Sequence, residues 1–145
     1  MGYVEYSVSI DLRETQNQFG KFSPYNVLKD VKEHKISRSM LEYIAEDIAD
    51  ELKRGWGRSA CEAIYWGELR MANYSKIRVG DRERNTGGSN GYRCIVLVDK
   101  INNFAFILHI YRHGHGEAEN ISAKDKNKLK TLVDKYIHEL KEADS

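Results

Sequence analysis

Hydrophobic and polar residues alternate along residues 3–12, where valine, tyrosine, isoleucine and leucine take every second position. A period of two with β-branched and aromatic side chains is typical of a strand with one buried face. Residues 14–22 lack such a pattern, and we expect a loop there. Ser23 and Pro24 are suited to an N-cap and a first helical position, so they predict a short helix over 23–34.

A more regular pattern follows, in which apolar residues recur every three or four positions and acidic residues occupy the other side. This spacing predicts an amphipathic helix over 38–54, with Ser37 as its N-cap and Gly55 at its end. The segment 58–72 is compatible with a helix, a strand or both. Its bulky side chains are expected to pack against the core: Tyr65, Trp66 and Leu69.

Three apolar runs in the second half of the chain predict strands, over residues 75–82, 92–99 and 104–113. Their connections, 85–91 and 100–103, are rich in turn-forming residues, and Asn102 and Asn103 can adopt positive φ. Short connections join antiparallel neighbours, so the three strands should form a meander. A last amphipathic helix is predicted over 122–143, capped by Ser122.

This order of elements predicts an α+β fold. We expect an antiparallel β-sheet, made of the N-terminal strand and the three-stranded meander, packed against two N-terminal helices and a C-terminal helix. The chain has 145 residues, close to the common size of one domain, and no linker divides it. Residues 1–145 are therefore expected to form a single domain.

Composition narrows the class of protein. Hydrophobic residues make up 41% and charged residues 31% of the chain, which indicates a globular protein. Cys61 and Cys94 form no C-x-x-C pair and are expected to be reduced thiols, with Cys94 filling the core. The N-terminus lacks the apolar stretch of a signal peptide, and no apolar run could span a bilayer, so we expect a cytoplasmic location without membrane contact.

The positive charge is concentrated in the middle of the chain, although the net charge is only +1. Residues 70–115 contain 8 basic and 3 acidic side chains, whereas the segments on either side are slightly acidic. A local basic surface favours an anionic ligand. Lys76 and Arg78 alternate along one strand and should share a face. The HGHG sequence at 113–116 offers only two histidines, so no metal site is expected.

Several short motifs in this basic region occur in an order that resembles a known family. Residues 69–81 read LRMANYSKIRVGD, residues 91–96 read GYRCIV, and residues 104–115 read FAFILHIYRHGH. Together they resemble the RelE/ParE superfamily of bacterial toxin–antitoxin systems, and in particular its RelE and HigB-like mRNA interferases. In that family a Y-[KR]-I-[KR]-V-G-[DN]-Y-R strand leads into Y-R-[VL]-[IV]-Y. Residues 82–90 resemble an insertion that lengthens the hairpin.

The resemblance implies a RelE-like fold and the toxin of a toxin–antitoxin pair. It also implies a metal-independent, ribosome-associated endoribonuclease that needs no cofactor. The ribose 2′-OH would attack the adjacent phosphate, leaving a 2′,3′-cyclic phosphate and a 5′-OH, while the protein neutralises charge and moves protons. The implied partners are a cognate antitoxin protein and mRNA in the ribosomal A site.

The resemblance also implies roles for individual residues. Lys76 and Arg78 match the two basic residues of the first hairpin strand, and Arg93 matches the arginine that stabilises the transition state. His113 or His115 could act as general acid or base, because imidazole titrates near neutral pH. A second group is expected to bind RNA: Arg70, Arg82, Arg84, Arg112 and Lys124. The late catalytic tyrosine of some relatives has no match, since Glu119 or Asn120 takes its place.

Other interpretations of the same residues stay open. Lys76 and Arg78 could simply be a solvated face, and Arg93 could be a structural partner of Asp99 or Asp81. His109 alternates with apolar residues and is expected to be a hydrogen-bonded residue of the sheet. The near-neutral charge and the unmatched tyrosine favour a binding module on the same fold, such as a ParE-like gyrase inhibitor or an RNA-binding protein. An inactive relative is the third possibility.

Overall fold

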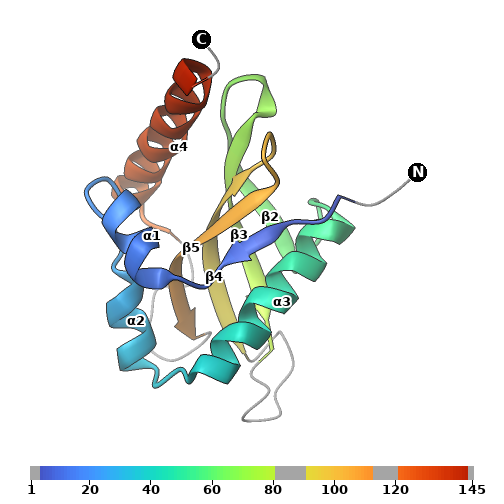
Figure 1. The fold of residues 1–145 in the computed structure, drawn as a ribbon, viewed down its shortest axis with the longest axis vertical. Helices are drawn as coiled ribbons and strands as arrows, with labels where there is room; N and C mark the ends of the chain where they lie inside the picture. Colours follow the sequence, from blue (N-terminus) through green and yellow to red (C-terminus); the bar gives the residue numbers. More distant parts are fainter. Residues whose placement is uncertain (1–3, 81–90, 113–120, 144–145) are drawn as a thin grey trace.

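The protein was analysed as a computed structural model, in which residues 4–80, 91–112 and 121–143 are described. Within these residues, five strands form one mixed sheet in the order β1-β5-β4-β3-β2 (Figure 1). The strands are β1 Ser7–Ser9, β2 Cys61–Trp66, β3 Ala72–Val79, β4 Tyr92–Asp99 and β5 Phe104–Arg112. The expected α+β class is confirmed in this coarse form.

The meander of β3, β4 and β5 is antiparallel, as predicted. β4 has the predicted bounds, and the turn that follows it uses Asn103 with φ of 58°. β3 begins at Ala72, three residues before the predicted start. The ambiguous segment 58–72 contributes β2, which pairs antiparallel with β3 and extends the sheet at that edge.

The expectation of a purely antiparallel sheet is wrong. β1 is parallel to β5, with Ser7 opposite Phe104 and Ser9 opposite Phe106. It is also shorter than the predicted strand over 3–12, because the chain leaves the sheet and starts a helix at Leu12. A parallel neighbour cannot be recognised from a single alternating segment, because alternation reports burial and not strand direction.

The loop expected over 14–22 is largely a helix, α1 Leu12–Phe19. Asp11 caps it by accepting a hydrogen bond from the Glu14 backbone N–H at 3.1 Å. The next helix, α2 Val27–Glu33, starts later than predicted because Asn26 is its N-cap, accepting from the Lys29 N–H at 3.1 Å. Both helices lie against β5.

The two long helices have the predicted bounds to within one residue. α3 Arg38–Arg54 begins after Ser37, whose hydroxyl accepts from the Met40 N–H at 3.1 Å, and ends at Gly55, whose φ is 94°. α4 Ala123–Ala143 begins with Ser122 accepting from the Asp125 N–H at 3.1 Å. No helix of the described ranges has the length and apolarity that a membrane span requires.

One core expectation is wrong at the turn between β2 and β3. The short helix η1 Glu68–Arg70 carries Leu69, whose side chain is exposed rather than packed. Leu69 and Arg70 have φ of 53° and 55°, a conformation that turns the chain tightly and points Leu69 outward. Tyr65 and Trp66 are partly buried, as expected.

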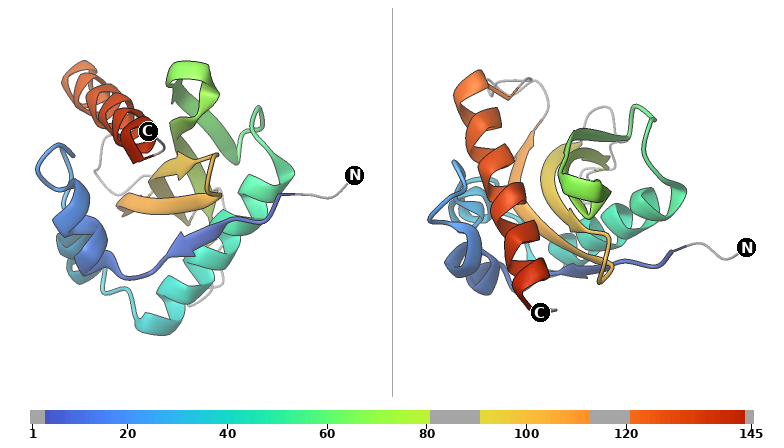
Figure 2. Two further views of the ribbon diagram at one scale, coloured as in Figure 1. Left: turned by 45° about the horizontal axis from the view of Figure 1, so that its top comes forward. Right: turned by 90° about the horizontal axis from the view of Figure 1, so that it is seen from above.

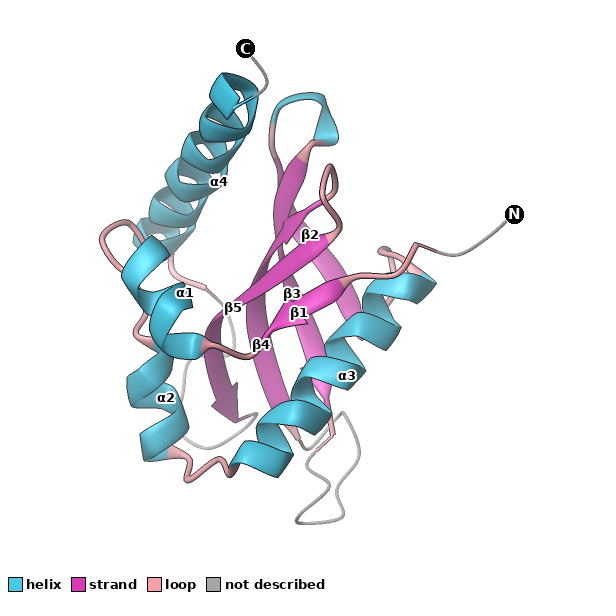
Figure 3. Cartoon of the chain, viewed as in Figure 1, coloured by secondary structure: helices cyan, strands magenta, loops and turns pink. Residues whose placement is uncertain are grey.

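The sheet lies between α3 on one face and α4 on the other (Figures 2 and 3). The α3 face packs apolar residues of even number in β4, including Cys94, Val96 and Val98. The α4 face packs Ile95 and Leu97 of the same strand against Leu129 and Val133. Cys94 is fully buried, so the predicted core role of this cysteine is confirmed.

Candidate functional site

Three of the predicted site residues share the α4 face of the sheet. Arg78 of β3 lies directly opposite Arg93 of β4, and Lys76 lies opposite Ile95. These positions alternate with residues such as Ile77 and Cys94, which pack on the α3 face. The structure therefore brings Lys76, Arg78 and Arg93 together on one surface.

The Arg78–Arg93 pair is unfavourable for stability. Directly opposite residues in an antiparallel pair have Cβ atoms only about 5 Å apart, and like charges there destabilise the sheet. Arg78 and Lys76 are partly exposed, and the ion pairs observed between described residues include neither of them. Lys76 and Arg78 therefore present positive charge that an anion could contact.

Two buried polar atoms on the same face of β3 have no hydrogen-bond partner among the described residues. They are Tyr74 Oη and Arg78 Nε, which stand on either side of Lys76 along the strand. Burial raises the pKa of the Tyr74 phenol, so it stays a protonated donor. Unsatisfied buried donors are uncommon in folded proteins and each costs about 1–3 kcal/mol. Of the two residues, only Arg78 is partly exposed and accessible to a ligand with acceptor oxygens, because Tyr74 is fully buried.

Arg93 differs from its neighbours because it is only 4% exposed and is engaged by other groups of the protein. Asp99 is not its partner: it accepts from the N–H groups of Ile101 and Asn102 and from the hydroxyl of Tyr136, at 2.8, 2.9 and 2.6 Å. Asp99 also lies six residues further along the strand, roughly 20 Å away. Arg93 therefore adds charge beneath the surface that Lys76 and Arg78 present.

Arg112, which was expected to bind RNA, lies on the opposite face of the sheet from Lys76, Arg78 and Arg93. It pairs with Tyr92, donating to the phenol oxygen at 2.7 Å with its guanidinium 4.4 Å from the ring centroid. A β-bulge at Leu108 is the cause, because one extra residue in β5 reverses the alternation beyond it. Arg112 therefore does not lie beside Lys76, Arg78 and Arg93.

Two other predicted RNA-binding residues also lie apart. Arg70 is in η1 at the far end of β3, roughly 25 Å along the strand from Arg78, with its guanidinium 4.0 Å from the Trp66 ring centroid. It lines an open cleft of about 520 Å³ together with Trp56 and Trp66. Lys124 is exposed in the first turn of α4. Arg82, Arg84, His113 and His115 lie outside the described residues, as do Asp81, Glu119 and Asn120.

Bulge residue Leu108 has a second consequence, since it places His109 and Tyr111 on the α4 face. His109 lies opposite Ile95, and Tyr111 lies opposite Arg93. His109 is hydrogen-bonded to Asp30 of α2 through Nδ1 at 2.8 Å, which confirms the expectation that it is a hydrogen-bonded residue of the sheet.

Sequence reasoning missed Asp30, Tyr25 and Tyr111, which surround His109. Tyr25 stacks on the imidazole, with ring centroids 3.9 Å apart and an interplanar angle of 5°. Tyr111 also stacks on it, with ring centroids 5.0 Å apart and an interplanar angle of 20°. Burial raises the pKa of the Tyr25 phenol far above its ordinary value, and the negative charge of Asp125 raises it further. The bulge is the signal that would have revealed this cluster, and it is not visible in the sequence.

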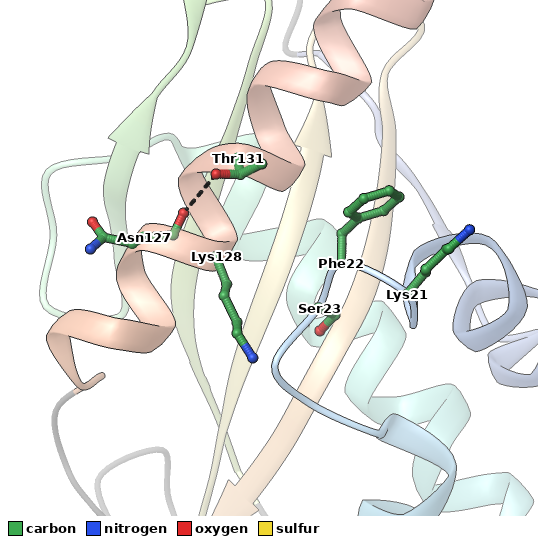
Figure 4. A pocket seen from close by; sticks show the side chains of 6 residues that line it. All are labelled: Lys21, Phe22, Ser23, Asn127, Lys128 and Thr131. Carbon is green, nitrogen blue, oxygen red and sulfur yellow. Dashed lines mark hydrogen bonds between the residues drawn. The ribbon is translucent and has the colours of Figure 1, made fainter.

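A cleft of about 330 Å³ lies between α4 and the connection from α1 to α2 (Figure 4). Phe22 and Lys128 point into the space between the two segments, and Lys21 stands at its rim (Figure 4). The cleft adjoins the His109 cluster along the chain, because the Ser23 hydroxyl accepts from the Tyr25 N–H at 3.1 Å. An aromatic ring with lysines is typical of surfaces that bind single-stranded nucleic acid.

Comparisons with known proteins do not assign the chain to a family, since no family model, curated protein or solved structure matches it. The part of the chain that the structure describes also contains no group of three or more His, Cys, Asp or Glu side chains arranged to hold a metal. The site must therefore be interpreted from its own residues.

Proposed function

We propose that this protein is the toxin of a toxin–antitoxin pair and acts as a metal-independent endoribonuclease on mRNA in the ribosomal A site. One observation carries the proposal: Lys76, Arg78 and Arg93 lie on one face of β3 and β4, where Arg78 Nε has no hydrogen-bond partner among the described residues. A phosphodiester supplies negative charge for Lys76 and Arg78 and acceptor oxygens for the Arg78 guanidinium.

In this proposal, Lys76 and Arg78 bind the non-bridging oxygens of the scissile phosphate. The buried charge of Arg93 stabilises the additional negative charge that develops on phosphorus when the 2′ oxygen attacks. Such donors are more effective in a partly buried site than in water, because the surrounding dielectric constant is lower.

The cleft between α4 and the connection from α1 to α2, lined by Phe22, Lys21 and Lys128, offers a place for a base elsewhere along the bound RNA. Stacking on an aromatic ring contributes about 1–3 kcal/mol per base and tolerates any base. The cognate antitoxin would then inhibit the toxin by covering the basic face, and a short reading frame beside the gene would be its source.

The proposal is tested by inducing the protein in a bacterial host and mapping new 5′ ends of transcripts. The wild type should arrest growth and cleave mRNA within codons, leaving 5′-OH ends. The double variant Lys76→Met and Arg78→Met should lose both effects, because Met keeps the apolar stem and removes the charge. Lys29→Met with Arg38→Met is the matched control, since it removes two exposed charges on the helices α2 and α3.

Cleavage by the Lys76 and Arg78 double variant at the wild-type rate would refute the site. Growth arrest with intact transcripts and a DNA-damage response would instead favour a gyrase-inhibiting module on the same fold. Because both double variants lose two positive charges, a difference between them reports the position of the charge and not the net charge.

A further inference from the structure

Both tryptophans of the chain line the same cleft. Trp56 follows α3 and Trp66 ends β2, and their ring centroids are 5.0 Å apart with an interplanar angle of 69°. The cleft measures about 520 Å³ and is open to solvent, and both indoles are partly exposed. Its volume lies within the range of about 300–1,000 Å³ that is typical of sites for small ligands. We call it the tryptophan cleft.

The indoles are held in place by the strands beneath them. The Trp56 Nε1–H donates to Ser75 Oγ at 2.8 Å, and the Ser75 hydroxyl donates to Asn73 Oδ1 at 2.6 Å. Trp66 lies opposite Asn73 in the pairing of β2 with β3. Asn73 and Ser75 alternate along β3 with the residues of the proposed phosphodiester site, so the two indoles lie on the other face of the sheet.

Two positive side chains lie close to these rings. Arg70, which also lines the cleft, has Cζ 4.0 Å from the Trp66 ring centroid, and Lys100 has Nζ 5.4 Å from the centroids of both indoles. Both side chains are exposed, and the ion pairs observed between described residues include neither of them. An anion at the cleft can therefore reach their N–H groups.

Two turns come together to place these cations. Arg70 belongs to η1 and has φ of 55°, a conformation that costs energy in residues other than glycine. The Lys100 backbone N–H donates to the Met71 carbonyl at 2.9 Å, which ties the turn between β4 and β5 to η1. Glu68 of η1 pairs with Lys141 of α4 at 2.9 Å. These contacts hold η1 in the conformation that brings Arg70 over Trp66.

We infer that the tryptophan cleft is a further binding site, which takes one nucleotide of a single-stranded nucleic acid. The base stacks against the indoles and the Arg70 guanidinium, since bases stack on aromatic rings and on guanidinium planes. The adjoining phosphate binds Arg70 and Lys100 through charge-assisted hydrogen bonds. The inference goes beyond the proposed ribonuclease, because the cleft lies on the other face of the sheet and binding there requires no cleavage.

The chemistry of the cleft favours a nucleotide over an acidic peptide. Carboxylates would satisfy the two cations but would leave the indoles without a flat partner. A nucleotide brings both the negative charge and a planar aromatic surface. Aromatic rings combined with positive side chains are the elements by which proteins bind single strands without reading their sequence.

Intrinsic fluorescence reports on this site directly, because both tryptophans of the chain lie in it. The full chain is titrated with a 2′-O-methyl oligouridylate of six nucleotides, which cannot be cleaved by 2′-OH attack. We expect saturable quenching and slower quenching of the bound protein by acrylamide, since the base covers the indoles. An abasic oligomer with the same number of phosphates should bind about 5- to 150-fold more weakly, the range that corresponds to the loss of one stacked base.

A double variant tests the two cations. Arg70→Met with Lys100→Met removes both charges and keeps both indoles, so fluorescence can still be read. Its affinity for the oligouridylate should fall at least about tenfold, and the slope of log affinity against log salt should decrease by about 1.4, the value for two phosphate contacts on a single strand. Lys29→Met with Arg38→Met, which removes two exposed charges on α2 and α3, is the matched control and should bind like the wild type. Circular dichroism checks the folding of each variant.

The variant Lys76→Met with Arg78→Met separates this inference from the proposed function. It should lose cleavage and keep the quenching, because its charges lie on the other face of the sheet. A wild type that shows the quenching but cleaves no RNA would refute the proposed function and support this inference.

Four results would overturn the inference alone. They are the absence of saturable quenching in the wild type, equal affinity for the abasic oligomer, wild-type affinity in the Arg70 and Lys100 double variant, and tighter binding of hexaglutamate than of the oligouridylate. The last result would assign the cleft to an acidic peptide. The first two use the unaltered protein, so they do not depend on the folding of any variant.

Discussion

Replacing Arg78 with methionine should make the protein more stable. The Arg78 Nε group is buried without a partner among the described residues, and such a donor costs about 1–3 kcal/mol. The guanidinium also lies opposite Arg93, and relief of a like-charge cross-strand pair adds a few tenths to about 1 kcal/mol. Methionine keeps the apolar stem, so the loss of packing is small.

The expected gain is therefore roughly 1–3 kcal/mol in the free energy of unfolding, or about 3–9 °C in the melting temperature of a domain of this size. Urea unfolding in low-salt buffer measures it, since urea is uncharged and does not screen the repulsion. Arg38→Met is the control, because Arg38 is exposed and paired only at 3.5 Å with Glu42, and its change should stay within about 0.5 kcal/mol.

Inorganic phosphate should stabilise the wild type but not the Arg78→Met variant. If phosphate binds between Arg78 and Arg93, it stabilises the wild type by mass action and leaves Arg78→Met unchanged. A destabilisation of Arg78→Met by more than 0.5 kcal/mol would refute the reasoning, because it would mean that Arg78 is satisfied in the free protein and has no need of an anion.

Three further predictions concern residues outside this cluster. Arg112→Met should lower the free energy of unfolding by about 1–2 kcal/mol, because it removes the hydrogen bond to Tyr92. RNA cleavage per folded molecule should not change, and a selective loss of cleavage would contradict the placement of Arg112 on the α3 face. Tyr136→Phe should lower the free energy of unfolding, measured with urea, by about 1–3 kcal/mol, because it removes a 2.6 Å hydrogen bond to the buried Asp99 carboxylate. An unchanged free energy of unfolding would contradict that hydrogen bond. Burial raises the pKa of Cys61 to about 11, so iodoacetamide should label this thiol slowly at pH 8 in the folded protein and rapidly after unfolding. The free energy of unfolding should fall as the pH rises from about 9 to about 11, because the thiol of the unfolded chain ionises first.

Strong periodic signals were enough to predict the main elements. α3 and α4 have long apolar stripes with Ser37 and Ser122 as caps, and β4 is bounded by turn-forming residues, so local sequence and tertiary packing agree there. α1 was missed because only three of its residues are buried and its cap, Asp11, lies within an apparent strand.

The site was predictable only in part. Lys76 and Arg78 share a face because β3 is regular, and alternation alone shows this. Arg112 was misplaced because the bulge at Leu108 reverses the alternation in β5. The bond from Asp30 to His109 joins residues 79 positions apart, and such a contact depends on how α2 packs against β5, which no local pattern encodes.

The central claim is that the α4 face around Lys76, Arg78 and Arg93 holds a phosphodiester. Heteronuclear NMR with a short 2′-O-methyl RNA, which cannot be cleaved by 2′-OH attack, tests this most directly. The Nε–H signal of Arg78 and the amide signals of β3 and β4 beside it should shift on titration, while those of Arg112 should not. Shifts confined to the α3 face or to the helices, or no saturable shift at all, would contradict the account.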